Sequence, residues 1–131
     1  MSEVLDFLSK RRSVTAKRMS EGNVLEEHLQ LILNAGLRVP DHGGVKPWKI
    51  SVIKGERRKI FDEKVILNEF LKDNKNASEE LIKMESSRFQ RAHTVIAILS
   101  TPELDHKIPE WEQVLSAGAP ADKTCSHSGI L

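Results

Sequence analysis

The sequence predicts a fold of mixed helices and strands in which helices greatly outnumber strands. Apolar residues at helical spacing indicate four or five helices, whereas only residues 48–53 and 94–99 have the pattern of a strand. Two strands do not form a stable sheet by themselves. The near-continuous apolar run at 94–99 is also typical of a central strand covered on both faces. The pattern therefore looks like the front part of a larger fold.

Composition sets the class of protein. With 131 residues the chain is one domain or part of one, and its net charge of +1 gives no overall basic field for binding nucleic acid. The single cysteine, Cys125, excludes an internal disulfide framework and agrees with a reducing compartment. The longest apolar run is far shorter than the roughly 20 residues that span a bilayer. We therefore expect a cytoplasmic protein with no membrane partner and no nucleic-acid partner.

The first half of the chain has clear local signals. Apolar residues at helical spacing predict a helix over residues 3–10. Asn23, with Glu26 three residues later, matches a capping box and predicts the start of a second helix. Pro40 ends that helix because the residue before a proline is pushed out of the α region. Alternating apolar and polar residues then predict a strand over 48–53.

The second half is predicted to continue with helices over 60–71 and 78–91 and a strand over 94–99. Pro109 suits the first turn of a further helix. Pro120 interrupts that helical pattern, and the residues after it are polar and aperiodic. We therefore expect the last helix to stop before Pro120.

A basic run comes directly after the first predicted helix: Lys10, Arg11 and Arg12, then Ser13. Cations at a helix C-terminus complement the helix dipole, and this is the simplest explanation. Guanidinium groups also bind phosphate oxygens in pairs, and a neighbouring hydroxyl adds one more donor. The run alone leaves both explanations open.

A second candidate site is the loop from Leu37 to Trp48, which lies between a predicted helix and a predicted strand. It combines Arg38, His42, two prolines and the pair Gly43-Gly44. Loops held on a rigid frame are where binding residues concentrate. A plain helix-to-strand connection explains the same residues, so this loop also remains open to both interpretations.

The other polar residues predict no site. Four residues lack the spacing of zinc ligands, so we expect no metal: His93, His106, His127 and Cys125. Glu110 and Glu112 flank Trp111 in a predicted helix, where residues two apart do not face each other. Paired-carboxylate chemistry is therefore not expected.

Taken together, an ordered set of short motifs resembles the FMN-dependent nitroreductase family, particularly its small bacterial branch of NAD(P)H nitroreductases. The resemblance runs from residue 3 to about residue 119. The motifs are Arg11-Arg12-Ser13, Ala35-Gly36-Leu37-Arg38-Val39-Pro40-Asp41-His42, Pro47-Trp48, His106-Lys107-Ile108-Pro109, Trp111-Glu112-Gln113 and Ser116-Ala117-Gly118.

This resemblance implies an α+β fold, a mainly antiparallel sheet flanked by helices, incomplete in this chain. It implies FMN as cofactor and NAD(P)H as co-substrate, with ping-pong hydride transfer through the flavin to a nitroaromatic, quinone or similar small-molecule acceptor. It also implies a homodimer with the flavin at the subunit interface. Because the flavin carries the chemistry, no side chain is expected to be catalytic.

The resemblance assigns five cofactor-binding residues. Arg11, Arg12 and Ser13 match the motif that holds the FMN phosphate and ribityl chain. Arg38 and His42 match positions that reach FMN from the partner subunit. The family usually has glutamine before the Pro-Trp pair, whereas this chain has Lys46, whose charge either alters flavin tuning or points to solvent.

Residues 1–119 are accordingly interpreted as the N-terminal part of a nitroreductase-like domain, and residues 120–131 as a tail read out of frame. Family members commonly continue through two small residues into Gln-Asn-Met-Leu and a long apolar helix. Codons can be chosen for Asp122–Ser126 so that dropping two bases gives Gln-Asn-Met-Leu at the expected spacing. We expect the loss of later strands to impair activity.

Two alternatives remain. The chain could be a non-catalytic module that binds anions or flavin through Arg11, Arg12 and Arg38, or that forms heterodimers with an intact relative. A nucleic-acid-binding role for the basic N-terminal residues Lys10, Arg11, Arg12, Lys17 and Arg18 is not favoured, because the net charge is near zero and no stacking-aromatic motif is present.

Overall fold

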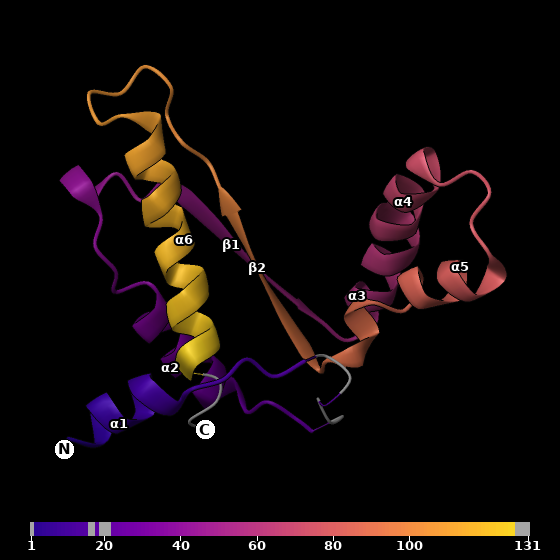
Figure 1. Ribbon diagram of the computed structural model, residues 1–131, viewed down its shortest axis with the longest axis horizontal. Helices are drawn as coiled ribbons and strands as arrows, with labels where there is room; N and C mark the ends of the chain where they lie inside the picture. Colours follow the sequence, from indigo (N-terminus) through magenta and orange to yellow (C-terminus); the bar gives the residue numbers. More distant parts are fainter. Residues whose placement is uncertain (1, 16–17, 19–21, 128–131) are drawn as a thin grey trace. The chain divides into compact units, whose positions relative to one another are not determined.

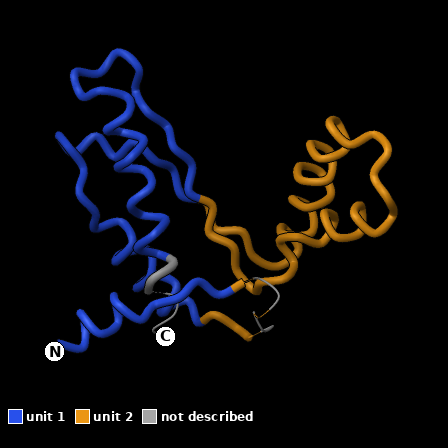
Figure 2. The backbone as a smooth tube through the Cα atoms, viewed as in Figure 1, with its two compact units in different colours: residues 1–14, 25–50, 98–131 blue, residues 15–24, 51–97 orange. Residues whose placement is uncertain are grey.

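The computed structural model describes residues 2–15, 18 and 22–127 of the chain. The chain divides into two compact units (Figure 2). Unit 1 contains residues 1–14, 25–50 and 98–131, and unit 2 contains residues 15–24 and 51–97. Lys17, from the weaker nucleic-acid alternative, lies outside the described residues.

The two predicted strands are confirmed. β1 (Trp48–Lys54) and β2 (Thr94–Ser100) form a two-stranded antiparallel sheet (Figure 1). The Thr101 N–H donates to the Pro47 carbonyl at 2.9 Å, just beyond the paired ends in unit 1. The side chains of β2 are half-buried and its last two are exposed, so the described residues do not cover both of its faces. Among the described residues β1 is its single neighbouring strand, so no strand covers its other edge.

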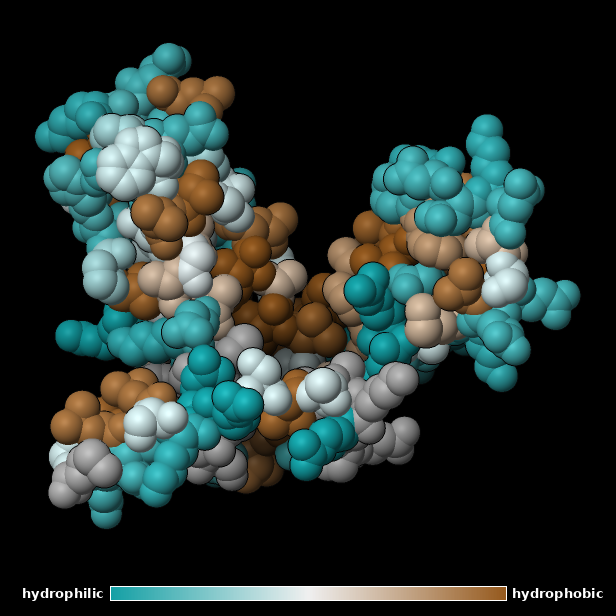
Figure 3. Space-filling view, viewed as in Figure 1, coloured by the Kyte–Doolittle hydropathy of each residue, from teal (hydrophilic) through white to brown (hydrophobic). Residues whose placement is uncertain are grey.

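The first predicted helix is confirmed as α1 (Glu3–Lys10). Ser2 caps it, because its hydroxyl oxygen accepts from the Leu5 N–H at 3.4 Å, and Lys10 occupies the last turn. The helix buries none of its residues: Val4 is 66% exposed, and Leu5 and Leu8 are similar. Apolar surface is visible where α1 lies, at the lower left of Figure 3.

The second helix exists, but its predicted start is wrong. α2 (Glu26–Gly36) begins after Leu25, which has an extended backbone and no capping side chain. Asn23 lies two residues too early to cap it. The acidic residues Glu26 and Glu27 occupy the first turn, where the helix dipole favours negative charge.

The last helix is longer than predicted. α6 (Glu110–His127) continues through Pro120, so the expected stop before this proline is wrong. An interior proline removes one backbone hydrogen bond and typically costs about 3 kcal/mol. Here the Pro120 side chain is fully buried, and its carbonyl oxygen lies beside Gly36 of α2. Packing between α2 and α6 therefore offsets the cost of the interior proline, and the helix continues where the sequence pattern predicted its end.

The core of unit 1 lies largely between α2 and α6. From α2 it takes Leu29 and Ile32, and from α6 it takes Ala117. Gly36 allows a close approach, because a Cβ there would overlap the hydroxyl of Thr124. The Thr124 side chain is 7% exposed, and its hydroxyl has no hydrogen-bond partner among the described residues. This crossing is thus tight but carries an unpaired polar atom.

Gln113 fixes the loop that leads into α6. Its side chain is 1% exposed, and both the oxygen and the nitrogen of its amide make hydrogen bonds. Its amide nitrogen donates to the carbonyls of Glu103 at 3.0 Å and Ile108 at 2.9 Å, while its oxygen accepts from the Glu103 N–H at 2.9 Å. Because a buried, fully paired amide specifies one arrangement, the start of α6 is held in place.

Unit 2 contains the helices between the strands. The predicted helix over 60–71 is confirmed as a continuous helical stretch of α3 (Glu56–Phe61), the π-helical turn η3 (Asp62–Ile66) and α4 (Leu67–Asp73). The helix predicted over 78–91 is shorter. α5 (Glu79–Glu85) ends early, and a separate 3₁₀ turn, η4 (Phe89–Arg91), comes after it.

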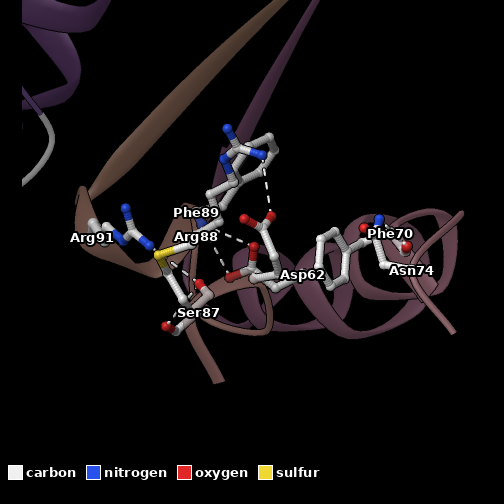
Figure 4. Close-up of polar contacts among 9 residues, drawn as sticks. Asp62, Phe70, Asn74, Ser87, Arg88, Phe89 and Arg91 are labelled. Carbon is white, nitrogen blue, oxygen red and sulfur yellow. Dashed lines mark hydrogen bonds and ion pairs between the residues drawn. The ribbon is translucent and has the colours of Figure 1, made fainter. Parts of the chain in front are cut away.

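Asp62 joins η3 to η4 (Figure 4). Its side chain is 0% exposed. Its two carboxylate oxygens accept from the Phe89 N–H at 2.8 and 3.1 Å, and one also accepts from the Gln90 side chain at 3.1 Å. The Phe61 and Phe89 rings stack beside it with centroids 5.0 Å apart. Since this carboxylate satisfies the first N–H of η4, it explains why the chain turns there.

Candidate functional site

The first candidate site is an open pocket of about 380 Å³ lined by Arg11, Arg12 and Ser13. It forms because α1 ends at Lys10. Arg11 then leaves the helix with an extended backbone, while its N–H donates to the Phe7 carbonyl at 2.8 Å. The sequence-predicted trio therefore lies around one hollow in unit 1.

The donor set of this pocket suits a phosphate or another anion. Two guanidinium groups supply positive charge and paired N–H donors, and Ser13 supplies a hydroxyl. Arg11 has an anionic neighbour, because its Nη2 lies 3.8 Å from a carboxylate oxygen of Asp122, whose side chain is 78% exposed. A long and solvated ion pair of this kind is weak, so Arg11 is still able to meet an incoming anion.

The second candidate site is the loop after α2. Gly43 and Gly44 have φ values of 72° and 66°, and Lys46 has φ 53°. The Lys46 N–H donates to the Asp41 carboxylate at 2.8 Å, which closes the loop around η2 (His42–Gly44). The Lys46 side chain itself is exposed. Lys46 stands where the family usually has glutamine. Its exposure agrees with the interpretation that the charge points to solvent, and not with the one in which it alters flavin tuning.

His42 has a partner that sequence reasoning missed. Its Nδ1 lies 2.6 Å from Oε2 of Glu112, in the first turn of α6. The two residues are 70 positions apart, so no local spacing could have indicated the pair. They help to line a second open pocket of about 380 Å³, together with Pro40, Asp41, Trp111, Leu115 and Ser116.

Arg38 stands apart from both pockets. Its side chain is exposed and lines neither of them, and its backbone carbonyl accepts from the Lys123 Nζ at 2.5 Å. The five predicted cofactor residues are thus not gathered in one place. Arg11, Arg12 and Ser13 line one pocket, His42 lines another, and Arg38 lies outside both.

Among the residues that the structure describes, no metal site competes with these pockets. No three histidine, cysteine, aspartate or glutamate side chains in this part of the chain come together in a way that would hold a metal ion. The side chains of Cys125 and His127 lie outside the described residues. None of the described helices is long and apolar enough to cross a membrane.

Solved structures share the architecture. A nitroreductase-like family protein from Bacillus cereus matches 99% of this chain and 66% of its own, with a TM-score of 0.77 and 22% identity. A nitroreductase with bound FMN from Bacteroides fragilis NCTC 9343 matches 98% and 65%, with a TM-score of 0.70 and 15% identity. At these identities the likeness establishes the fold, and the α+β nitroreductase-like fold expected from the sequence is confirmed.

Sequence relatives establish the family. The model of the nitroreductase family matches residues 8–124, so the chain belongs to this family. It is 37% identical over 116 residues to YdjA of Escherichia coli (strain K12), which its name describes provisionally as an NAD(P)H nitroreductase. A protein of Haemophilus influenzae with the same description is 27% identical over 116 residues. The match covers 88% of this chain and 61% of each relative.

Proposed function

We propose that this chain carries part of the flavin site of an FMN-dependent oxidoreductase that uses NAD(P)H to reduce nitroaromatics, quinones or similar acceptors. FMN, when bound, supplies the redox chemistry: it takes hydride equivalents from NAD(P)H and passes electrons to the acceptor. The chain's own residues bind and orient it. We place the protein in the cytoplasm, in agreement with its single cysteine.

The observation that carries this proposal is the pocket lined by Arg11, Arg12 and Ser13. FMN ends in a phosphate, and these three side chains are the donors that such a group requires. The family membership of residues 8–124 and the bound FMN of the Bacteroides fragilis structure support the choice of flavin phosphate over other anions.

The remaining two predicted residues are assigned to a partner subunit's flavin. His42 and Arg38 do not line the pocket of Arg11 in the same chain, which agrees with flavin sites built between two copies. The apolar residues that α1 exposes, Val4, Leu5 and Leu8, supply surface that a second copy could cover. The proposed assembly is a homodimer.

The test is a titration of the purified chain with FMN, monitored by quenching of flavin fluorescence. We expect saturable binding that weakens at least about tenfold in Arg12→Ala, because a charge-assisted contact to phosphate is worth more than about 1.4 kcal/mol. Arg57→Ala is the matched control, since Arg57 is exposed and lines neither pocket. Equal loss in both variants, or no binding by the unmodified chain, contradicts the proposal.

The same pocket supports the second candidate, a non-catalytic anion- or flavin-binding module that pairs with an intact relative. The observation in its favour is that the sheet has only two strands among the described residues. Two strands do not form a stable sheet by themselves, so an intact relative could supply what this chain lacks. A chain that binds FMN but does not oxidise NAD(P)H in the presence of a quinone favours the module. Co-elution with a full-length relative in size-exclusion chromatography identifies the heterodimer.

The out-of-frame interpretation of residues 120–131 is also a proposal. The unpaired hydroxyl of Thr124, buried against Gly36, supports it. The shifted frame, Gln-Asn-Met-Leu from position 122, puts an apolar methionine at position 124, where burial costs no hydrogen bond. Sequencing the gene tests the proposal, and a shifted frame that lacks an apolar amphipathic continuation overturns it.

A further inference from the structure

The pair His42 and Glu112 defines how the imidazole is oriented. An ionised carboxylate only accepts hydrogen bonds, so the 2.6 Å contact to Oε2 requires that Nδ1 carries the hydrogen. Nε2 is the other ring nitrogen, and it makes no hydrogen bond to a described residue. The carboxylate therefore selects one tautomer and leaves Nε2 available to a ligand.

Both members of the pair are attached to fixed backbone. Glu112 lies in the first turn of α6, next to Gln113, whose three buried hydrogen bonds hold this turn against the preceding loop. His42 lies in η2, between Asp41, which accepts from the Lys46 N–H, and Gly43 with its φ of 72°. The Glu112 side chain is 27% exposed, and that of His42 is 63% exposed. The less exposed carboxylate is thus the anchor, and the more exposed ring is the group it orients.

We propose that Glu112 is the positioning residue for His42, holding the ring in the Nδ1–H tautomer so that Nε2 is presented to the flavin of the partner subunit. This rests on the proposed function of His42. An exposed imidazole without an anchor would sample several rotamers and both tautomers. Restricting it before the ligand arrives reduces the ordering cost of binding.

A merely structural role makes a different prediction. If the pair only ties the loop to α6, Glu112→Ala and His42→Ala break the same tie and weaken flavin binding by the same factor. If Glu112 positions the ring for the flavin, His42→Ala weakens binding more than Glu112→Ala, because it also removes the contact that Nε2 makes. Glu112→Gln separates charge from geometry, because its amide oxygen still accepts from Nδ1–H.

The first arm of the test needs no flavin. Two-bond proton–nitrogen NMR spectra of the histidine rings in the ¹⁵N-labelled full chain report which nitrogen carries the hydrogen, and His42→Ala identifies the signals. We expect Nδ1–H in the unmodified chain and in Glu112→Gln. We expect the Nε2–H form to gain in Glu112→Ala. Glu110→Ala is the matched control, because it removes an exposed carboxylate from the same helical turn.

The second arm is an FMN titration of the same proteins. Glu112→Ala should weaken binding about threefold to tenfold, as expected when one side chain must be ordered on binding. Glu112→Gln and Glu110→Ala should change it by less than about twofold. His42→Ala should weaken binding more than Glu112→Ala, and adding Glu112→Ala to it should have no further effect.

The outcomes are separable. The positioning role is supported by the expected tautomers together with a loss of FMN binding that is larger in His42→Ala than in Glu112→Ala and does not grow in the double variant. An Nε2–H tautomer in the unmodified chain, equal losses in the two single variants, or effects that multiply overturns the positioning role alone. Failure of the unmodified chain to bind FMN overturns the proposed function and the positioning role together.

Discussion

The carboxylate of Asp62 and the backbone N–H of Phe89 are joined by two contacts, at 2.8 and 3.1 Å, across 27 positions of sequence. Asp62 lies in the π-helical turn η3, and Phe89 begins the 3₁₀ turn η4. A further hydrogen bond from Gln90 completes the surroundings of the buried carboxylate. These contacts fasten the interior of the continuous helical stretch of α3, η3 and α4 to the turn that precedes β2.

Asp62→Ala should destabilise unit 2 by about 2–4 kcal/mol, because it leaves a backbone N–H without its charged acceptor. Asp62→Asn should cost less, because its single carbonyl oxygen still accepts. Amide hydrogen exchange of Phe89 is the sharpest measurement, and its protection should fall in both variants. Asp73→Ala, at an exposed position at the end of α4, is the control and should change stability by at most about 0.5 kcal/mol. Unchanged protection of Phe89 would contradict the prediction.

Gln113→Leu should destabilise unit 1 by about 2–3 kcal/mol. The substitution keeps an apolar group of similar size but removes all three hydrogen bonds to Glu103 and Ile108. Trp48 and Trp111 both belong to unit 1, so their fluorescence during urea unfolding reports on it.

The control for Gln113 is Gln30→Leu on α2. Its amide makes one exposed bond to Glu26 at 3.2 Å, four residues earlier, and losing it should cost at most about 0.5 kcal/mol. A loss for Gln113→Leu no larger than that of this control would show that the three hydrogen bonds contribute little.

Where local pattern decides, the sequence predicts the fold correctly. The spacing of apolar residues in α1 and the alternation of apolar and polar residues over 48–52 in β1 are local signals, so both predictions lie close to the observed bounds. Asn23 shows the opposite case: its capping box is a valid local signal, yet α2 starts later. The hydrogen bond that the Asp62 carboxylate accepts from the Phe89 N–H joins residues 27 positions apart, so it has no local signature.

The candidate site divides in the same way. Arg11, Arg12 and Ser13 are adjacent in sequence, so the prediction that they act together is a local one, and they line one pocket. Their role toward FMN stays a prediction. Local spacing predicts no partner for Glu112, because the nearby Glu110 does not face it on the helix. Its partner in the structure is His42, which lies in another element. Pairs of this kind become visible only when the fold brings distant segments together.

Asp122→Asn should strengthen FMN binding by about twofold to fivefold at low ionic strength. Its carboxylate lies 3.8 Å from Arg11 and competes with a phosphate for the same guanidinium group. The gain should shrink in about 0.5 M salt, because an exposed charge pair is screened. Asp105→Asn is the control, an exposed carboxylate of unit 1 that lines neither pocket. An equal gain in both variants would mean that net charge alone, and not the position of Asp122, sets the affinity.

Gly36→Ala should destabilise the chain by about 1–3 kcal/mol, although alanine is intrinsically a better helix former than glycine. The reason is the tight crossing of α2 and α6, where the new Cβ would overlap the Thr124 hydroxyl. In the Thr124→Ala background that hydroxyl is absent, and the nearest remaining atoms are the Thr124 Cβ position at 3.5 Å and the Pro120 carbonyl oxygen at 3.7 Å. Gly36→Ala should then be neutral or stabilising. Urea unfolding of the four proteins in this double-mutant cycle measures the coupling, and additive effects would contradict the close approach of the two helices at this point.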